Sequence, residues 1–141
     1  MMNPSLHTLA RTLLAAIFLI SSVRHIMGFA IVSGMMARKG FPVPEVFLAL
    51  TIALEIVGGL MLVANWNARY AAWALAAFTL AAGSIFHGFW NVWTASPPEF
   101  NNEFNHFLKN VAIVGGLLLI ATSRSDETPL WRQVSTKVTA S

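Results

Sequence analysis

Residues 45–64 read EVFLALTIALEIVGGLMLVA, and this stretch decides the class of the protein. Apart from its first residue, only Glu55 carries a charge in it. A helix of about 20 mostly apolar residues is long enough to cross the hydrocarbon core of a bilayer. The stretch therefore predicts a membrane-spanning helix that carries one carboxylate near its middle.

The composition of the whole chain agrees with a membrane protein. Hydrophobic residues make up 56% of the 141 residues and charged residues 11%, whereas soluble domains carry about a quarter charged residues. An ordinary soluble domain and a disordered chain are excluded. Three further stretches resemble the first in length and polarity. We predict an all-α, polytopic four-helix transmembrane bundle as a single domain over residues 1–124, with helices at about 8–29, 45–64, 69–93 and 104–123 and a polar cytoplasmic tail over 125–141.

Several chemistries are excluded by missing residue types. The chain has no cysteine, which rules out disulfides, zinc–thiolate sites and iron–sulfur clusters. It has no glycine-rich phosphate loop. The net charge of +3 reflects membrane topology, so no nucleic-acid partner is expected; the expected partner is the lipid bilayer. No metal site is expected.

The distribution of basic residues predicts the topology. Five Lys and Arg residues lie near the N-terminus, in the second loop and in the tail, whereas the first and third loops carry Arg38 and Lys39 together with three acidic residues. By the positive-inside rule both termini lie in the cytoplasm. The sequence IVGGLMLVA of residues 56–64 also returns as IVGGLLLIA in residues 113–121. This echo predicts two parallel two-helix repeats.

Each predicted helix carries one ionisable residue at membrane depth: Arg24, Glu55, His87 and Lys109. Charged groups in a bilayer cost a few kcal/mol each on insertion scales, so they should face the bundle and pair. We expect Arg24 or Lys109 to pair with Glu55, and His87 and Asn110 to complete the network. Arg24 is expected on an inward stripe with Ser21 and Gly28, and the pocket is expected to open away from the cytoplasm. The alternative is that these charges only fix the helix register. His25 and His106 are expected in solvent near the interface.

Five short motifs resemble one known family. They are RHIMGF at residues 24–29, GFP at 40–42, LEIVGG at 54–59, FHGFW at 86–90 and NHFLKNVA at 105–112. Together they resemble the DoxX family of small bacterial membrane proteins over about residues 9–122, although Arg24 stands where many members have lysine. The resemblance implies a four-helix inner-membrane protein. It also implies a link to membrane redox systems, such as a thiosulfate:quinone oxidoreductase subunit or defence against oxidative stress, and distant relatives act as assembly factors.

The leading functional hypothesis is a small subunit of a membrane redox or oxidative-stress system, with a quinone-like ligand in the polar pocket. Glu55 and His87 would relay protons. The ligand-binding residues would be Arg24, His87, Trp90, Lys109 and Asn110. No side chain carries electrons by itself, so a membrane or periplasmic redox partner protein or a bound cofactor would be required.

Three alternatives remain open. The chain could be a non-enzymatic assembly or scaffold protein whose glycine pairs provide packing faces for other helices, including those of a homo-oligomer. It could be a minimal transporter or proton pathway. A haem held by His25 and His87 is the least favoured, because a lone histidine on a helix face is more often structural.

Overall fold

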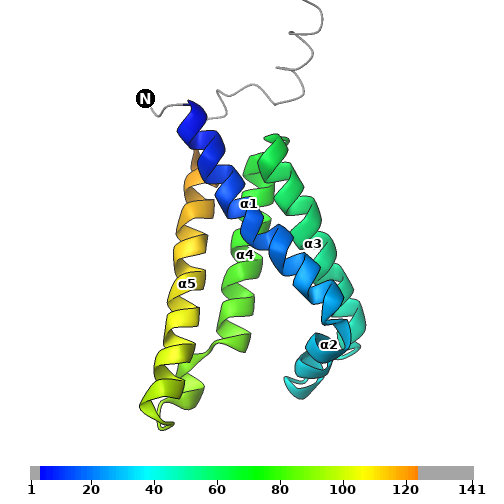
Figure 1. Ribbon diagram of the computed structural model, residues 1–141, viewed down its shortest axis with the longest axis vertical. Coiled ribbons are helices and arrows are strands. Elements are labelled where there is room, and N and C mark those ends of the chain that lie inside the picture. Colours follow the sequence, from blue (N-terminus) through cyan, green and yellow to red (C-terminus); the bar gives the residue numbers. More distant parts are fainter. Residues whose placement is uncertain (1–3, 124–141) are drawn as a thin grey trace, which may run out of the picture.

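The computed structural model describes residues 4–123, which are entirely helical apart from turns (Figure 1). The elements are α1 (Pro4–Met27), α2 (Phe29–Arg38), α3 (Pro44–Ala64), α4 (Ala68–Phe86), the short 3₁₀ helix η1 (Phe89–Val92) and α5 (Pro97–Thr122). Within these residues, four helical segments are long and apolar enough to cross a membrane. The predicted all-α bundle of four spans is confirmed.

The helix bounds differ most from the predicted ones at three places. The first loop contains an additional helix, α2, which starts directly after Gly28. The third span ends as an α-helix at Phe86 and continues only as η1. The fourth begins at Pro97, seven residues before the predicted position 104. Proline has no N–H to leave unsatisfied in a first turn, so Pro97 and Pro98 open a helix rather than a loop. The predicted tail, residues 125–141, lies outside the described residues.

A tight turn joins α3 to α4 and makes them antiparallel neighbours. Asn65 and Asn67 both adopt left-handed backbone conformations, with φ values of 52° and 48°. Asparagine accepts this region more readily than other non-glycine residues. The turn that the Asn-Trp-Asn sequence suggests is therefore present.

The glycine pair of α3 lets two neighbouring helices approach closely. A Cβ on Gly58 would lie 2.9 Å from Cγ of Leu75 on α4, and one on Gly59 would lie 2.9 Å from Leu19 on α1. No side chain fits at either position without displacing a neighbour. Gly58 and Gly59 are therefore positions of close helix packing within the bundle.

The apolar core fills only one half of the bundle, near the α3–α4 turn and the N-terminus. It consists of small and medium side chains: Ala15, Phe18, Leu62, Ala68, Ala71, Ala72, Leu75, Ala76, Leu117, Ile120 and Ala121. In Figure 1, α1 runs diagonally from the end of α5 to the start of α3. Its closest neighbour is α3, while α4 pairs with α5. The two pairs separate toward the other end of the bundle, where α2 and η1 lie.

Each half of the chain has the same element order. A long helix, a short helix and a second long helix follow one another as α1–α2–α3 and again as α4–η1–α5. This order is what the internal sequence echo suggests, and the two-repeat arrangement stays a prediction.

Candidate functional site

A cavity of about 530 Å³ lies in the half of the bundle that the apolar core leaves open. This volume is in the range of small-molecule pockets, about 300–1,000 Å³. All four spans and α2 line it. The apolar part of the wall comes from Ile17, Phe18, Val32, Met35, Met36, Leu48, Phe78, Ala82, Phe86 and Ile113, and the polar part from Ser21, His25, Arg38, Lys39, Thr51, Glu55, Thr79, His87, Glu103 and Asn110.

The most buried charged side chain of the wall is Glu55, in the middle of α3. Its Oε2 lies 2.9 Å from Nδ1 of His25 on α1, and the Glu55 side chain is 4% exposed. A carboxylate so far from water needs a hydrogen-bonding partner, and His25 provides it. The prediction that Glu55 faces the bundle and pairs is therefore confirmed.

The predicted identity of that partner is wrong. Arg24 and Lys109 are both exposed and lie outside the cavity wall. Neighbouring residues of a helix point about 100° apart, so only one of Arg24 and His25 can face α3. The buried stripe of α1 contains Ala15, Phe18 and Ser22, and the next step of three residues reaches His25.

The spacing of that stripe in the sequence indicates that His25, and not Arg24, faces α3. Its steps of four and three residues define one helix face. The alternative stripe through Ser21 and Arg24 is one residue out of register, although Ser21 itself does reach the cavity.

A second histidine–carboxylate pair lies on the opposite wall. Nδ1 of His87, directly after α4, lies 3.0 Å from Oε2 of Glu103 on α5. The His87 ring also stacks on His106, with centroids 4.6 Å apart. His106 in turn accepts a hydrogen bond at 3.4 Å from Nζ of Lys109. The structure thus brings His87 to the cavity as predicted, and it adds Glu103, which we had not predicted.

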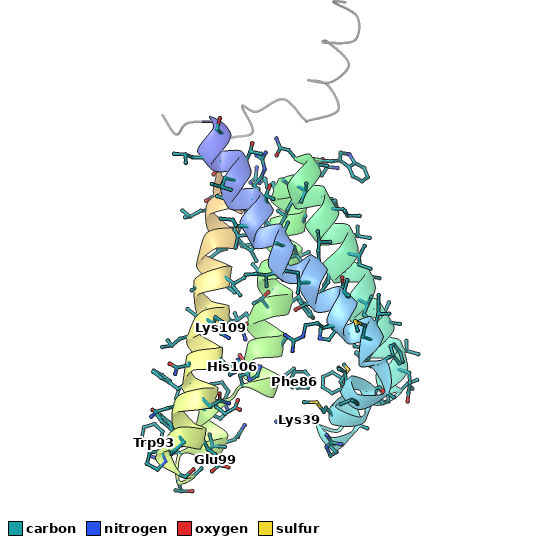
Figure 2. The ribbon with its side chains drawn as sticks, viewed as in Figure 1. Lys39, Phe86, Trp93, Glu99, His106 and Lys109 are labelled. Carbon is teal, nitrogen blue, oxygen red and sulfur yellow. The ribbon has the colours of Figure 1, made fainter. Side chains whose placement is uncertain are left out.

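His106 is only partly in solvent, because one side of its ring is covered by His87. Lys109 reaches the site only through this ring (Figure 2). The sequence does contain an indication of these α5 residues. Glu103, His106 and Asn110 are three and four residues apart, a spacing that puts them on one face of the helix.

Thr79 on α4 lines the cavity and carries an unsatisfied hydroxyl. Its side-chain Oγ1 is buried and has no hydrogen-bond partner among the described residues. A helical Ser or Thr often donates to the carbonyl four residues earlier, and Ser84 on the same helix does so, at 2.8 Å from the oxygen of Leu80. A buried hydroxyl without a partner costs free energy. Because Thr79 lines the cavity, a rotation of its side chain that turns Oγ1 toward the cavity would let the hydroxyl hydrogen-bond a ligand there.

Asn110 lines the cavity as predicted, and Trp90 does not. A Cβ on Gly83 would lie 2.8 Å from Nδ2 of Asn110, so the absence of a side chain at position 83 makes room for the amide. Trp90 is half-exposed and packs its ring on Phe89 and Phe107 outside the cavity.

The mouth of the cavity lies beside the end of α2. Arg38 and Lys39 line the cavity and are also exposed, so the cavity reaches the surface there. The Phe41 ring, on the loop after α2, stacks on Phe86 at the end of α4 with centroids 6.0 Å apart. Within residues 4–123, no group of three or more His, Cys, Asp or Glu residues could hold a metal ion.

Comparison with known proteins identifies relatives of the whole bundle. The DoxX family model matches residues 6–88. The chain is 30% identical over 120 residues to inner membrane protein YphA of Escherichia coli (strain K12), which covers 84% of this chain and 83% of that protein. It is 33% identical over 114 residues to inner membrane protein YqjF of the same organism, covering 79% and 78%. No solved structure matches. The family match spans more than half of the chain and every wall of the cavity except α5, and the chain therefore belongs to the DoxX family.

Proposed function

We propose that this chain is a small multi-pass subunit of an inner-membrane redox system, and that its cavity binds a quinone-like lipophilic ligand. The observation that supports this most directly is the combination, in one cavity, of apolar walls, a buried carboxylate–histidine pair and the unsatisfied hydroxyl of Thr79. The two relatives are both named inner membrane proteins, which supports the location.

The cavity chemistry suits a flat ring with carbonyl oxygens. Phe18, Phe78 and Ile113 supply apolar surface for a ring and tail. Thr79 and the Asn110 amide can donate hydrogen bonds to a carbonyl oxygen. Ligand sites commonly combine such apolar walls with a few polar groups that fix orientation.

The two histidine–glutamate pairs would handle protons. With the Nδ1 proton of His25 or His87 directed at its carboxylate, the other ring nitrogen can accept a proton from a ligand oxygen or return one to it. Glu55 holds His25 in that role, and Glu103 holds His87. Electrons would come from a partner protein at the same membrane face. The distribution of Lys and Arg supports cytoplasmic termini, and in that orientation this face would be the periplasmic one.

Binding can be tested by titrating the purified protein, in mild detergent, with a short-tail benzoquinone and following the adduct by native mass spectrometry. Thr79→Val removes one hydroxyl from the cavity at nearly constant volume, and it should weaken binding roughly fivefold if one hydrogen bond of about 1 kcal/mol is lost. Ser84→Ala removes a hydroxyl from the same helix outside the cavity and should leave binding unchanged.

Glu55→Gln tests the proton role separately. It keeps the shape and can still accept from His25, so the quinone should still bind while ligand-dependent activity with the redox partner is lost. Unchanged activity would refute the role of Glu55. Absence of any quinone adduct, together with a stoichiometric protein partner, would refute the ligand proposal and favour the assembly or scaffold function.

A further inference from the structure

The mouth of the cavity contains two cations without partners. Arg38 ends α2 and Lys39 follows it, and both residues line the cavity. Within the described chain neither side chain has an ion-pair or hydrogen-bond partner. From these two residues we propose that the cavity mouth binds the phosphate of an acidic phospholipid, with one acyl chain lying along the apolar wall. This proposal does not depend on the quinone.

The two glutamates of the same cavity are already paired with histidines. Glu55 is held by His25 and Glu103 by His87, at 2.9 Å and 3.0 Å. The other nearby acid, Glu45, is exposed and lies outside the cavity wall. Among residues 4–123, therefore, no acidic side chain neutralises Arg38 or Lys39, and an anion from outside the protein can do so.

The position of the pair along the bundle fits a headgroup. Lys39 precedes Pro44, the first residue of the second span, by only five residues. Figure 2 shows Lys39 at the same end of the molecule as Trp93, which is 71% exposed. Exposed tryptophans mark the headgroup level of a bilayer. Arg38 and Lys39 therefore lie at the depth where lipid phosphates lie.

The wall next to the two cations suits an acyl chain. Val32, Met35 and Met36 of α2 line the same cavity as Arg38, and Phe86 at the end of α4 lines it as well. Methionine side chains are flexible and adapt to irregular apolar ligands. A free phosphate would use only the charged mouth, whereas a phospholipid would use both parts, and so the lipid is the occupant that we propose.

The test is a titration of the full chain in mild detergent with phosphatidylglycerol and, separately, with phosphatidylcholine of the same acyl chains, read by native mass spectrometry. A basic residue near a membrane surface contributes about 1 kcal/mol to the binding of anionic lipid, which corresponds to roughly fivefold in affinity. Arg38→Gln and Lys39→Gln should each weaken phosphatidylglycerol binding by about that factor. Binding of phosphatidylcholine should be weaker and should not change.

Arg24→Gln is the matched control, because Arg24 is an exposed cation at the same end of the bundle but outside the cavity. It should leave phosphatidylglycerol binding unchanged. The proposal is overturned if the control weakens binding as much as Arg38→Gln, if both lipids bind alike, or if inorganic phosphate displaces the lipid completely. Glu55→Gln should not affect this titration, so failure here and failure of quinone binding are separate results.

Discussion

The two histidine–glutamate pairs of the cavity have the same chemistry and nearly the same length, and they differ in burial. Nδ1 to Oε2 is 2.9 Å for His25–Glu55 and 3.0 Å for His87–Glu103. The glutamate side chain is 4% exposed in the first pair and 28% exposed in the second. The contribution of each pair to stability should therefore follow solvent access rather than distance.

The expected magnitudes differ by several-fold. Removing His25 leaves the Glu55 carboxylate buried without a partner, and breaking a buried pair in this way costs about 3–5 kcal/mol. Removing His87 leaves a carboxylate that water can reach, and exposed pairs contribute only about 0.2–1 kcal/mol. In double-mutant cycles we expect a coupling energy of about 2–3 kcal/mol for His25 with Glu55 and below about 1 kcal/mol for His87 with Glu103.

The assay is reversible unfolding in mixed micelles by increasing the fraction of denaturing detergent, followed through the loss of helicity. Each cycle uses the histidine→Ala variant, the glutamate→Gln variant and the double variant. Arg24→Ala serves as the control, because Arg24 is the exposed neighbour of His25 and its loss should change the free energy of unfolding by less than about 0.5 kcal/mol. Equal coupling energies in the two cycles would refute the argument from burial.

Two further predictions concern packing and the cavity mouth. Gly115→Ala should raise the free energy of unfolding by up to about 1 kcal/mol through helix propensity, because nothing lies within 4 Å of its Cβ position. Gly58→Ala should be less stable than Gly115→Ala by about 1–3 kcal/mol, because its Cβ meets the fully buried Leu75, and equal stabilities in the same unfolding assay would contradict the close packing. Phe41→Ala removes the stacking on Phe86, worth about 0.5–1.5 kcal/mol, and should speed amide hydrogen exchange in α2. Unchanged exchange in α2 would show that this ring contact does not hold the helix in place.

The number and class of the spans could be predicted because hydropathy and length decide them. A stretch such as residues 45–64 is too long and too apolar for an ordinary helix of a soluble protein. The observed bounds of α3 agree with the predicted ones within one residue. The helix α2 could not be predicted in the same way. At ten residues it is too short to span a membrane, and a bounding Gly28 without a proline does not distinguish a kink from a loop.

The candidate site could be predicted only in part. Glu55, His87 and Asn110 were found because polar groups at membrane depth must face the protein. The partner of Glu55 was missed because Arg24 and His25 are adjacent, and charge alone favours arginine. Helix rotation decides between them, and that rotation is fixed by the packing of Ala15 and Phe18 rather than by the polar residues.

The arrangement of the cavity also bears on whether the ionisable residues inside the bundle serve only to fix the register of the helices. To fix the register of two helices, one hydrogen-bonded pair between them is enough, and His25 with Glu55 already joins α1 to α3. Fixing the register does not need a cavity of about 530 Å³, nor a buried hydroxyl left without a partner on α4. Both features cost stability without a ligand, since water that enters through the mouth covers apolar wall unfavourably and Thr79 loses a hydrogen bond. A ligand that fills the cavity and accepts from Thr79 removes both costs, which is why we favour a binding function over a purely structural one.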